Sequence, residues 1–224
     1  MDINEGYRFV QFLANQTQSG YIKPNDFNLA SERAQIQLFY TERQKWQDSQ
    51  IITDALSPFL TKIPLTVPAS GQVTYPSDYA GTSSVRHTYF LSSSTASNPK
   101  SISVDVDEIN DNAIGDVLSS QIVMPTKRYP RIAYYANYMR VFPKNLGSID
   151  FTYLREPKKP VWGFTTIPGT NNIQYDPSPS ASTNWEFLDQ YHNAIVMMIC
   201  SYFGMNLREA DVVQAAEMFK TQNI

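Results

Sequence analysis

The spacing of apolar residues changes twice along this chain of 224 residues. Near both ends, apolar side chains recur every three or four positions, as they do on one face of an α-helix. Between about residues 63 and 178, Val, Ile, Tyr and Phe instead alternate with polar residues in short runs, the pattern of half-buried strands. Terminal helices usually pack together. We therefore expect an α+β fold, a helical bundle formed by the N- and C-terminal helices with an inserted antiparallel β domain.

The N-terminal part, residues 1–62, is predicted to be helical. A first helix is expected over Ile3–Gln16, where Asp2 and Glu5 have the spacing of a capping box. A second helix is expected over Asn25–Asp48, and a short third one over Ile51–Leu60. The predicted core faces consist of apolar residues at helical spacing, which are Tyr7, Val10, Leu13 and Ala14 in the first helix and Leu29, Ile36, Phe39, Tyr40 and Trp46 in the second.

Two groups of strands are predicted in the β-rich part, residues 63–178. The first group is Leu65–Pro68, Gln72–Pro76, Ser83–Leu91 and Ser101–Ile109, followed by a short helix over Asn110–Ser120 that Asp111 caps. The second group lies within Pro125–Tyr175, where short runs separated by turn residues predict an antiparallel meander. These runs are Ile132–Tyr135, Tyr138–Phe142, Ile149–Leu154 and Val161–Phe164.

The C-terminal part, residues 179–224, returns to helical spacing. Thr183 and Glu186 have capping-box spacing ahead of an apolar stripe that ends at Tyr202, and Gly204 is placed to end that helix. A last helix is expected from Asn206. Its predicted buried residues are Val212, Val213, Ala216 and Phe219.

The composition favours protein partners over nucleic acid. The net charge is −3, charged residues make up 17% of the chain, and Lys and Arg form no cluster. A protein that binds phosphates tightly normally carries a basic stripe. Neutral polar groups cost less to desolvate than charges do, which suits burial against other proteins. No apolar run approaches the ~20 residues of a membrane span, and the first residues do not resemble a signal peptide. We therefore expect a protein made in the cytoplasm, without a membrane partner.

The residues that could carry chemistry do not form a recognisable site. Asp189 and His192, with Glu186 nearby, have the spacing of a weak metal motif, and His87 lies in a predicted strand. The Asp105–Asp111 stretch concentrates carboxylates without the pattern of a calcium loop, and reads better as an exposed edge strand.

Other candidate groups favour structural roles. Cys200, the sole cysteine, lies in an apolar helical run and is predicted to be a buried thiol. Lys127-Arg128 and Lys158-Lys159 are expected in solvated turns, and Tyr134, Tyr135 and Tyr138 in core or interface packing rather than in a stacking platform. Phosphate-binding glycine motifs are absent from the sequence. The sequence therefore predicts no catalytic, cofactor-binding or metal-ligating residue, and no cofactor.

Four segments carry a resemblance to a known family. They are the opening INEGYRFVQFLANQTQSGYIKPNDFNLASERAQIQLF (Ile3–Phe39), the turn YPSDYAGTSSVR (Tyr75–Arg86), IVMPTKRYPRIAYYANYMRVFPKNLGSIDFTYLREPKKPVWGF (Ile122–Phe164), and the tail from YDPSPSASTNWEF to GMNLREADVVQAAEMFK (Tyr175–Lys220). In this order they resemble the head-to-tail adaptor proteins, or neck-ring connectors, of tailed bacteriophages, especially those of crAss-like phages.

The resemblance implies a structural protein of the virion neck. Such proteins form a ring, expected here to have twelve subunits, that joins the portal protein to further neck or tail ring proteins. Genomic DNA passes through the bore without specific binding. Two alternatives stay open from the residues: a carbohydrate- or receptor-binding β module of a virion, and a small metal-dependent enzyme based on Asp105–Asp111 or on Asp189 and His192.

Overall fold

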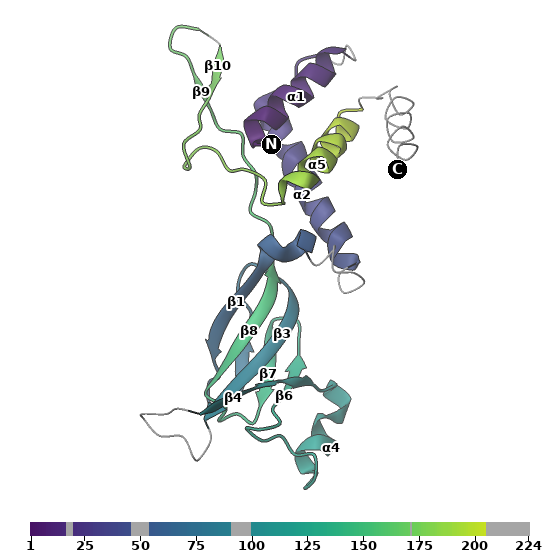
Figure 1. Ribbon diagram of the computed structural model, residues 1–224, viewed down its shortest axis with the longest axis vertical. Helices are drawn as coiled ribbons and strands as arrows, with labels where there is room; N and C mark the ends of the chain where they lie inside the picture. Colours follow the sequence, from purple (N-terminus) through teal and green to yellow (C-terminus); the bar gives the residue numbers. More distant parts are fainter. Residues whose placement is uncertain (17–19, 46–53, 91–99, 171, 205–224) are drawn as a thin grey trace. The chain divides into compact units, whose positions relative to one another are not determined.

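The computed structural model describes residues 1–16, 20–45, 54–90, 100–170 and 172–204. Within them the protein has a mixed α+β structure, as predicted. The chain divides into two compact units. The helical unit comprises Met1–Pro58 and Pro157–Ile224, and the β unit comprises Phe59–Glu156 (Figure 1).

The described residues of the helical unit include the helices α1 (Ile3–Gln16), α2 (Pro24–Gln44) and α5 (Asp189–Tyr202), with α5 in contact with both α1 and α2. The predicted bounds of α1 and its capping box are confirmed. Asp2 Oδ1 accepts a hydrogen bond from Glu5 N at 2.7 Å, and Glu5 Oε2 accepts one from Asp2 N at 3.0 Å. The predicted face of α1 is buried as well, with Val10 and Ala14 fully so.

The buried face of α2 agrees with the prediction at Phe39, which is fully buried, and differs from it elsewhere. Leu29 and Tyr40 are exposed, and Trp46 lies outside the described residues. The buried row includes two polar residues, Ser31 and Gln35, because both have hydrogen-bond partners in the chain after the β unit: Ser31 accepts from Trp185 Nε1, and Gln35 binds the backbone of Lys158 and Glu186. The row consists of Pro24, Phe27, Ala30, Ser31, Ala34, Gln35, Leu38 and Phe39.

Amide side chains of α2 hold this returning segment. Asn28 Oδ1 accepts a hydrogen bond from Trp162 N at 2.7 Å, while Asn28 Nδ2 donates to Trp162 O at 3.2 Å. Gln35 Nε2 donates to Lys158 O at 2.7 Å, and Gln35 Oε1 accepts from Glu186 N at 2.9 Å. Asn28 thereby pairs both backbone groups of the buried Trp162. The segment after Glu156 therefore belongs to the helical unit, whereas the sequence placed the end of the β insert at residue 178.

The hairpin β9 (Phe164–Thr166) and β10 (Ile173–Tyr175) also belongs to the helical unit. Only Phe164 of the predicted Val161–Phe164 strand lies in it, because Val161 forms an isolated bridge with Thr183. That bridge removes Thr183 from the predicted capping box.

The first residues of α5 are capped by no side chain. Its N-cap residue is Leu188, and Glu186 Oε2 accepts a hydrogen bond from Lys158 N instead, so the predicted Thr183–Glu186 capping box is wrong. Gly204 has a φ of 63° just beyond α5, in agreement with its predicted role as the helix-ending glycine. The helix predicted from Asn206 lies outside the described residues.

The β unit contains two four-stranded sheets. One has the strand order β1 (Leu60–Thr66), β8 (Ser148–Arg155), β3 (Tyr79–Phe90) and β4 (Ser101–Asp105). The other has the order β2 (Gln72–Thr74), β7 (Tyr138–Phe142), β6 (Arg131–Tyr134) and β5 (Asp107–Glu108). All of these pairs are antiparallel except β5 with β6.

The core of the β unit lies between these sheets. Val85, Ile149 and Phe151 come from the first sheet and pack in one cluster with Ile132, Met139 and Val141 of the second. Neighbouring residues alternate between this cluster and solvent, as the pleat requires. The alternating apolar residues in the sequence therefore correspond to the side chains that fill the space between the two sheets.

Two strand predictions are corrected by this topology. The predicted meander is confirmed only for β6 and β7, which pair antiparallel, because β8 pairs with β1 and β3 of the other sheet. The predicted Ser101–Ile109 strand is split at Val106, which is buried and whose N–H donates to Val85 O at 2.9 Å. The residues before Val106 therefore belong to the sheet that contains β4, and those after it to the sheet that contains β5.

The predicted short helices are present with altered ends. The described part of the predicted Ile51–Leu60 helix is helical over residues 54–56 and continues as the 3₁₀ turn η1 (Ser57–Phe59), while Leu60 already belongs to β1. The predicted Asn110–Ser120 helix is found as the 3₁₀ turn η2 (Asp111–Ala113) followed by α4 (Ile114–Ser119). The N-cap residue of η2 is Asn110, not Asp111.

Candidate assembly surfaces

Both histidines are buried, and each has a ring nitrogen close to a backbone carbonyl oxygen. His192 Nδ1 lies 2.6 Å from Met1 O and 3.2 Å from Asp189 Oδ1, and its Nε2 lies 2.8 Å from Phe187 O. Each ring nitrogen of His192 therefore already has an oxygen neighbour. His87 Nδ1 lies 2.9 Å from Ser148 O, and its Nε2 is buried with no hydrogen-bond partner among the described residues. Neither histidine is placed as a metal ligand by this geometry.

The carboxylates of the Asp105–Asp111 stretch turn to separate partners. Asp105 pairs with Arg86 at 2.9 Å, and Asp107 pairs with Arg131 at 3.1 Å. Asp111 accepts a hydrogen bond from the Tyr135 hydroxyl. In the part of the chain that the structure describes, no three His, Cys, Asp or Glu residues converge as they would around a metal ion.

The sole thiol and the three predicted tyrosines have packing roles. Cys200 is buried, as predicted, and burial raises the pKa of its thiol to about 11. Tyr134 packs against the core of the β unit, and burial is the main reason that its pKa rises to about 12. Tyr135 and Tyr138 stack on each other with ring centroids 4.8 Å apart. The three rings therefore do not form one platform.

The two basic pairs lie in different settings. Lys159 forms an ion pair with Glu32 of α2 at 2.8 Å, and the Lys158 carbonyl accepts the Gln35 bond described above. Lys127 and Arg128 are exposed, and the Arg128 guanidinium lies 5.6 Å from the centre of the Tyr129 ring. An exposed pair beside a tyrosine is typical of a solvated turn or of an interface.

One open hollow of ≈ 580 Å³ in the helical unit lies between the start of α2 and the β9–β10 hairpin. Its lining consists of Tyr21, Lys23, Pro24, Asn25, Asn172 and Ile173. These groups offer an aromatic ring, amides and a lysine, which suits polar binding. They do not include a carboxylate, histidine or thiol that would act as a general base or nucleophile.

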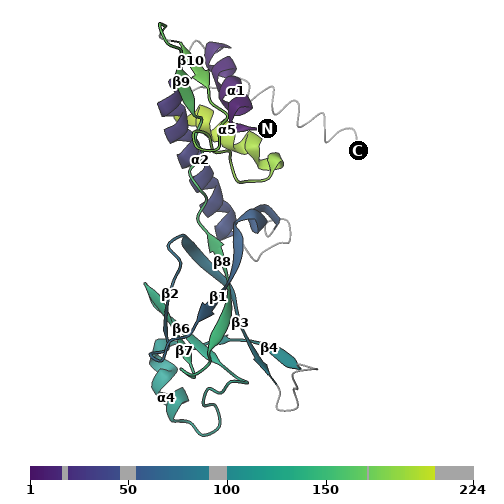
Figure 2. The same cartoon turned by 90° about the vertical axis from the view of Figure 1, so that its left-hand side faces the viewer.

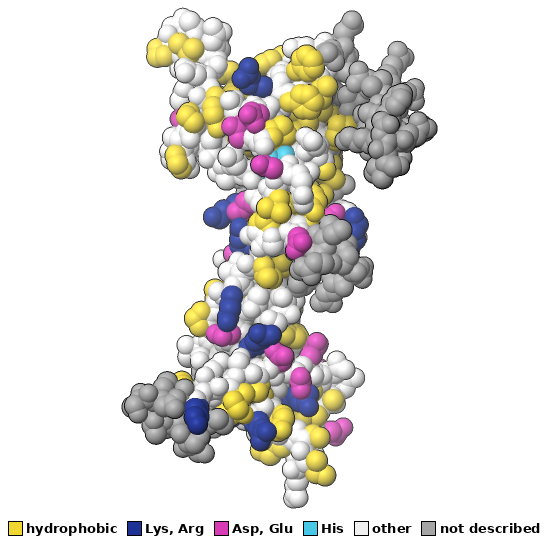
Figure 3. All heavy atoms as spheres, viewed as in Figure 1, with side chains coloured by type: hydrophobic (Ala, Val, Ile, Leu, Met, Phe, Trp, Pro, Cys, Tyr) yellow, Lys and Arg dark blue, Asp and Glu magenta, His cyan; other side chains and the backbone are white. Residues whose placement is uncertain are grey.

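Exposed apolar side chains are the most prominent feature of both units. In the helical unit they include Phe9 and Phe12 of α1 and Met197 of α5, and Figure 3 shows hydrophobic side chains gathered over these two helices. Among the described residues of the β unit, apart from Leu60, such side chains lie in two places. One is the end of the β3–β4 hairpin, with Phe90 and Ile102, and the other lies between residues 118 and 129.

The second place in the β unit is a structured segment. Ser120 Oγ accepts hydrogen bonds from Ile122 N and Val123 N, both at 3.2 Å. Thr126 and Tyr129 exchange two backbone hydrogen bonds, at 3.2 and 3.1 Å. These bonds hold the segment open while Ile122 is 94% exposed. We name its exposed apolar residues the α4 loop patch: Leu118, Ile122, Val123, Met124 and Tyr129.

The sequence patterns did not predict this patch. Its apolar residues neither alternate with polar ones, as in a strand, nor recur every three or four positions, as in a helix. Spacing patterns therefore do not identify them. The signal in the sequence is the apolar triplet Ile122–Met124 directly before Pro125, outside every predicted element.

No protein-family model matches this chain, and a search of curated proteins finds no match either. Among the described residues, no helix is both long and apolar enough to cross a membrane.

Proposed function

We propose that this protein is a ring-forming head-to-tail adaptor of a tailed phage virion, which joins the portal vertex to the tail and surrounds the DNA channel. The observation that carries the proposal is the contrast between its apolar surfaces and its reactive groups. Phe9, Phe90 and Ile122 are exposed at three separate places on two units, while Cys200 and His192 are buried and engaged in packing or hydrogen bonds. A protein whose work is binding to other proteins needs the former and does not need the latter.

The sequence resemblance adds the type of assembly. It implies a ring of twelve copies with the portal protein on one side and further neck or tail rings on the other. Each subunit of such a ring contacts its neighbours through two different surfaces, because a head-to-tail contact uses different patches on the two partners. Exposed patches at different places on one chain suit this requirement.

Each of the two units has its own role within that ring. The helical unit, through α2 or the segment after Gly204, binds the portal or a neighbouring subunit, and its N- and C-terminal helices complete one bundle. The β unit presents its face to the next ring or the tail. With a net charge of −3 and few clustered basic residues, the bore lets DNA pass without gripping its phosphates.

The proposal is tested by purifying the protein with the portal protein of the same virus. Electron microscopy of the mixture is expected to show an added ring on the portal. A Leu29→Ser variant tests the role of α2, because Leu29 is exposed on that helix. Loss of the added ring supports α2, and an unchanged ring assigns portal binding to another surface. Portal rings that remain bare in the presence of excess wild-type protein would contradict the adaptor proposal.

A carbohydrate-binding virion module is the second candidate, because Tyr21, Asn25 and Asn172 place an aromatic ring and two amides around one hollow. Such groups bind the apolar faces and hydroxyls of sugars. A glycan array would show specific ligands for this candidate, and Tyr21→Ala would abolish their binding. Metal analysis of the purified protein addresses the remaining enzyme alternative, which predicts a stoichiometric metal ion.

A further inference from the structure

The β3–β4 hairpin extends beyond the sheet to which it belongs. β8 pairs with β3 only as far as Arg86, while β3 and β4 continue to pair up to Phe90 and Ser101. Residues 88–90 and 101–103 therefore form a two-stranded ribbon, which we name the β3–β4 arm, and Figure 2 shows β4 leaving the body of the β unit. A two-stranded ribbon is only marginally stable in water unless it packs against something else.

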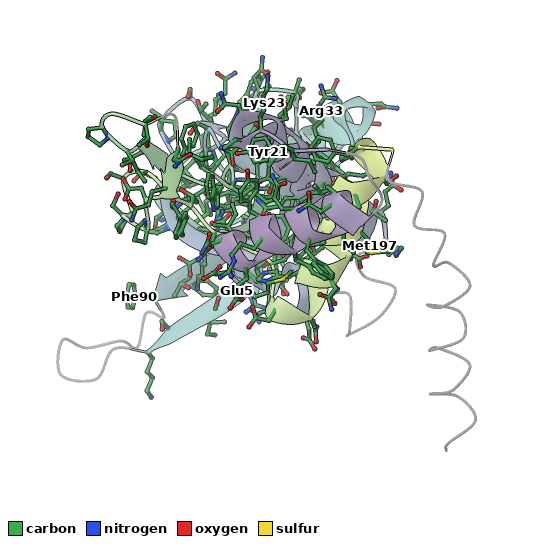
Figure 4. The ribbon with its side chains drawn as sticks, turned by 90° about the horizontal axis from the view of Figure 1, so that it is seen from above. Glu5, Tyr21, Lys23, Arg33, Phe90 and Met197 are labelled. Atoms are coloured by element: carbon green, nitrogen blue, oxygen red, sulfur yellow. The ribbon has the colours of Figure 1, made fainter. Side chains whose placement is uncertain are left out.

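The arm carries an apolar side chain on each face. Phe90 is 69% exposed and pairs with Ser101, whereas Ile102 is 40% exposed and pairs with Tyr89 on the opposite face. In Figure 4 the ring of Phe90 stands clear of the ribbon. The charges at the base of the arm are already matched, since Arg86 pairs with Asp105 at 2.9 Å. Burying the arm therefore removes apolar surface from water without isolating a charge.

The α4 loop patch has the area expected of a docking site. From the exposed fractions of its five side chains, it presents on the order of 500 Å² of apolar surface. A standard interface buries about 800 Å² on each partner, of which a little over half, or about 450 Å², is apolar. The patch thus accounts for the apolar part of one such interface.

The arm and the patch lie on opposite sides of the same β unit. Figures 1 and 2 agree in placing the beginning of β4 on one side and α4 on the other. One copy can therefore use both surfaces at once with two neighbours. We propose that the β3–β4 arm of one copy packs against the α4 loop patch of the next copy. This contact rests on the proposed ring-forming function and names the surfaces that close the ring.

Two complementary variants test the contact. The arm variant carries Phe90→Ser and Ile102→Ser, and the loop variant carries Ile122→Ser and Met124→Ser. Leu60→Ser is the matched control, because Leu60 is 44% exposed in the same unit and lies outside both surfaces. Circular dichroism and thermal unfolding establish that each variant is folded, and sedimentation velocity measures assembly.

Each double variant is expected to weaken self-association on the order of 100-fold, while the control assembles as the wild type does. An equimolar mixture of the arm and loop variants is expected to stop at heterodimers, since only one intact arm and one intact patch remain per pair. Rings of either double variant at wild-type concentrations, or a mixture that forms no heterodimer, would overturn the proposed contact.

A cysteine pair supplies an independent readout. Phe90→Cys and Ile122→Cys, placed in the same chain, are expected to form disulfides between copies and to link an assembled ring covalently. Cys200 is fully buried and does not interfere. Wild-type rings on the portal with no such cross-link would reject the contact and leave the adaptor function standing. Cross-linked copies that do not bind the portal would support the contact and reject the adaptor function. A wild-type protein that never self-associates would reject both the contact and the adaptor function.

Discussion

Substituting Gly6 by alanine tests the packing of the helical unit in one step. Gly6 is buried within α1, and a Cβ added there would lie 2.1 Å from Cη2 and 2.8 Å from Cζ3 of Trp185. Carbon atoms in contact are normally about 3.5–4.0 Å apart. The indole cannot move away freely, because its Nε1 donates a hydrogen bond to Ser31 Oγ at 2.6 Å and its ring packs 5.3 Å from that of His192.

Two opposing effects set the size of the change. Replacing Gly by Ala inside a helix ordinarily stabilises it by about 1 kcal/mol. Overpacking a core costs about 1–3 kcal/mol, and displacing the indole from Ser31 adds about 1 kcal/mol for the lost hydrogen bond. We therefore expect Gly6→Ala to lower the free energy of unfolding by about 1–3 kcal/mol, and the melting temperature by about 2–8 °C for each kcal/mol.

Gly115→Ala is the matched control, since Gly115 also lies in a helix and an added Cβ there meets nothing within 4 Å. It is expected to leave stability unchanged or to raise it by up to about 1 kcal/mol. Thermal unfolding followed by calorimetry and by tryptophan fluorescence measures both variants. A Gly6→Ala protein as stable as the wild type would refute the packing of Trp185 on α1.

Three further predictions follow from the described residues. Asp2→Ala removes the cap that binds Glu5 N, and calorimetry is expected to show a loss of about 0.5–2 kcal/mol, whereas no loss would mean that the cap does not form in solution. Cys200, buried and with its thiol pKa raised to about 11, is expected to resist iodoacetamide at pH 8 until the protein unfolds; rapid alkylation of folded protein would contradict this. Burial raises the pKa of both Tyr75 and Tyr134 to about 12, so the folded state keeps protons that the unfolded state loses near pH 10. The contribution of these two tyrosines to the stability of the β unit is therefore fully present below pH 10 and is lost as the pH rises through 12. An ultraviolet titration in which every tyrosine ionises near pH 10 would contradict this prediction.

The sequence predicted those elements whose structure depends only on residues close together in the chain. The capping pair Asp2 and Glu5 and the face of α1 follow from spacing within one helix. Tyr138–Phe142 was predicted with its bounds, because the alternation there is uninterrupted and both ends are turns. Gly204 and Cys200 were predicted from their place beside one apolar helical stripe.

Features that depend on distant partners could not be predicted in this way. Spacing alone could not show that Ser31 and Gln35 are buried, because their partners Trp185, Lys158 and Glu186 lie more than a hundred residues away. The sheet that a strand joins also depends on distant partners. The sequence of β8 resembles a further strand of the meander, yet β8 pairs with β1 and β3.

The candidate surfaces were the least predictable part. An exposed apolar residue and a buried one look alike in a sequence, so Phe90 and Ile122 became candidates only when their exposure was known.

The adaptor proposal is tested most directly by the mass of the protein in solution, alone and mixed with the portal protein, measured by native mass spectrometry. The proposal predicts that the 25.5 kDa chain forms a complex with the portal whose mass corresponds to a closed ring of identical copies, expected to be twelve. A protein that stays at 25.5 kDa with the portal and with the other neck and tail proteins of the same virus would contradict it.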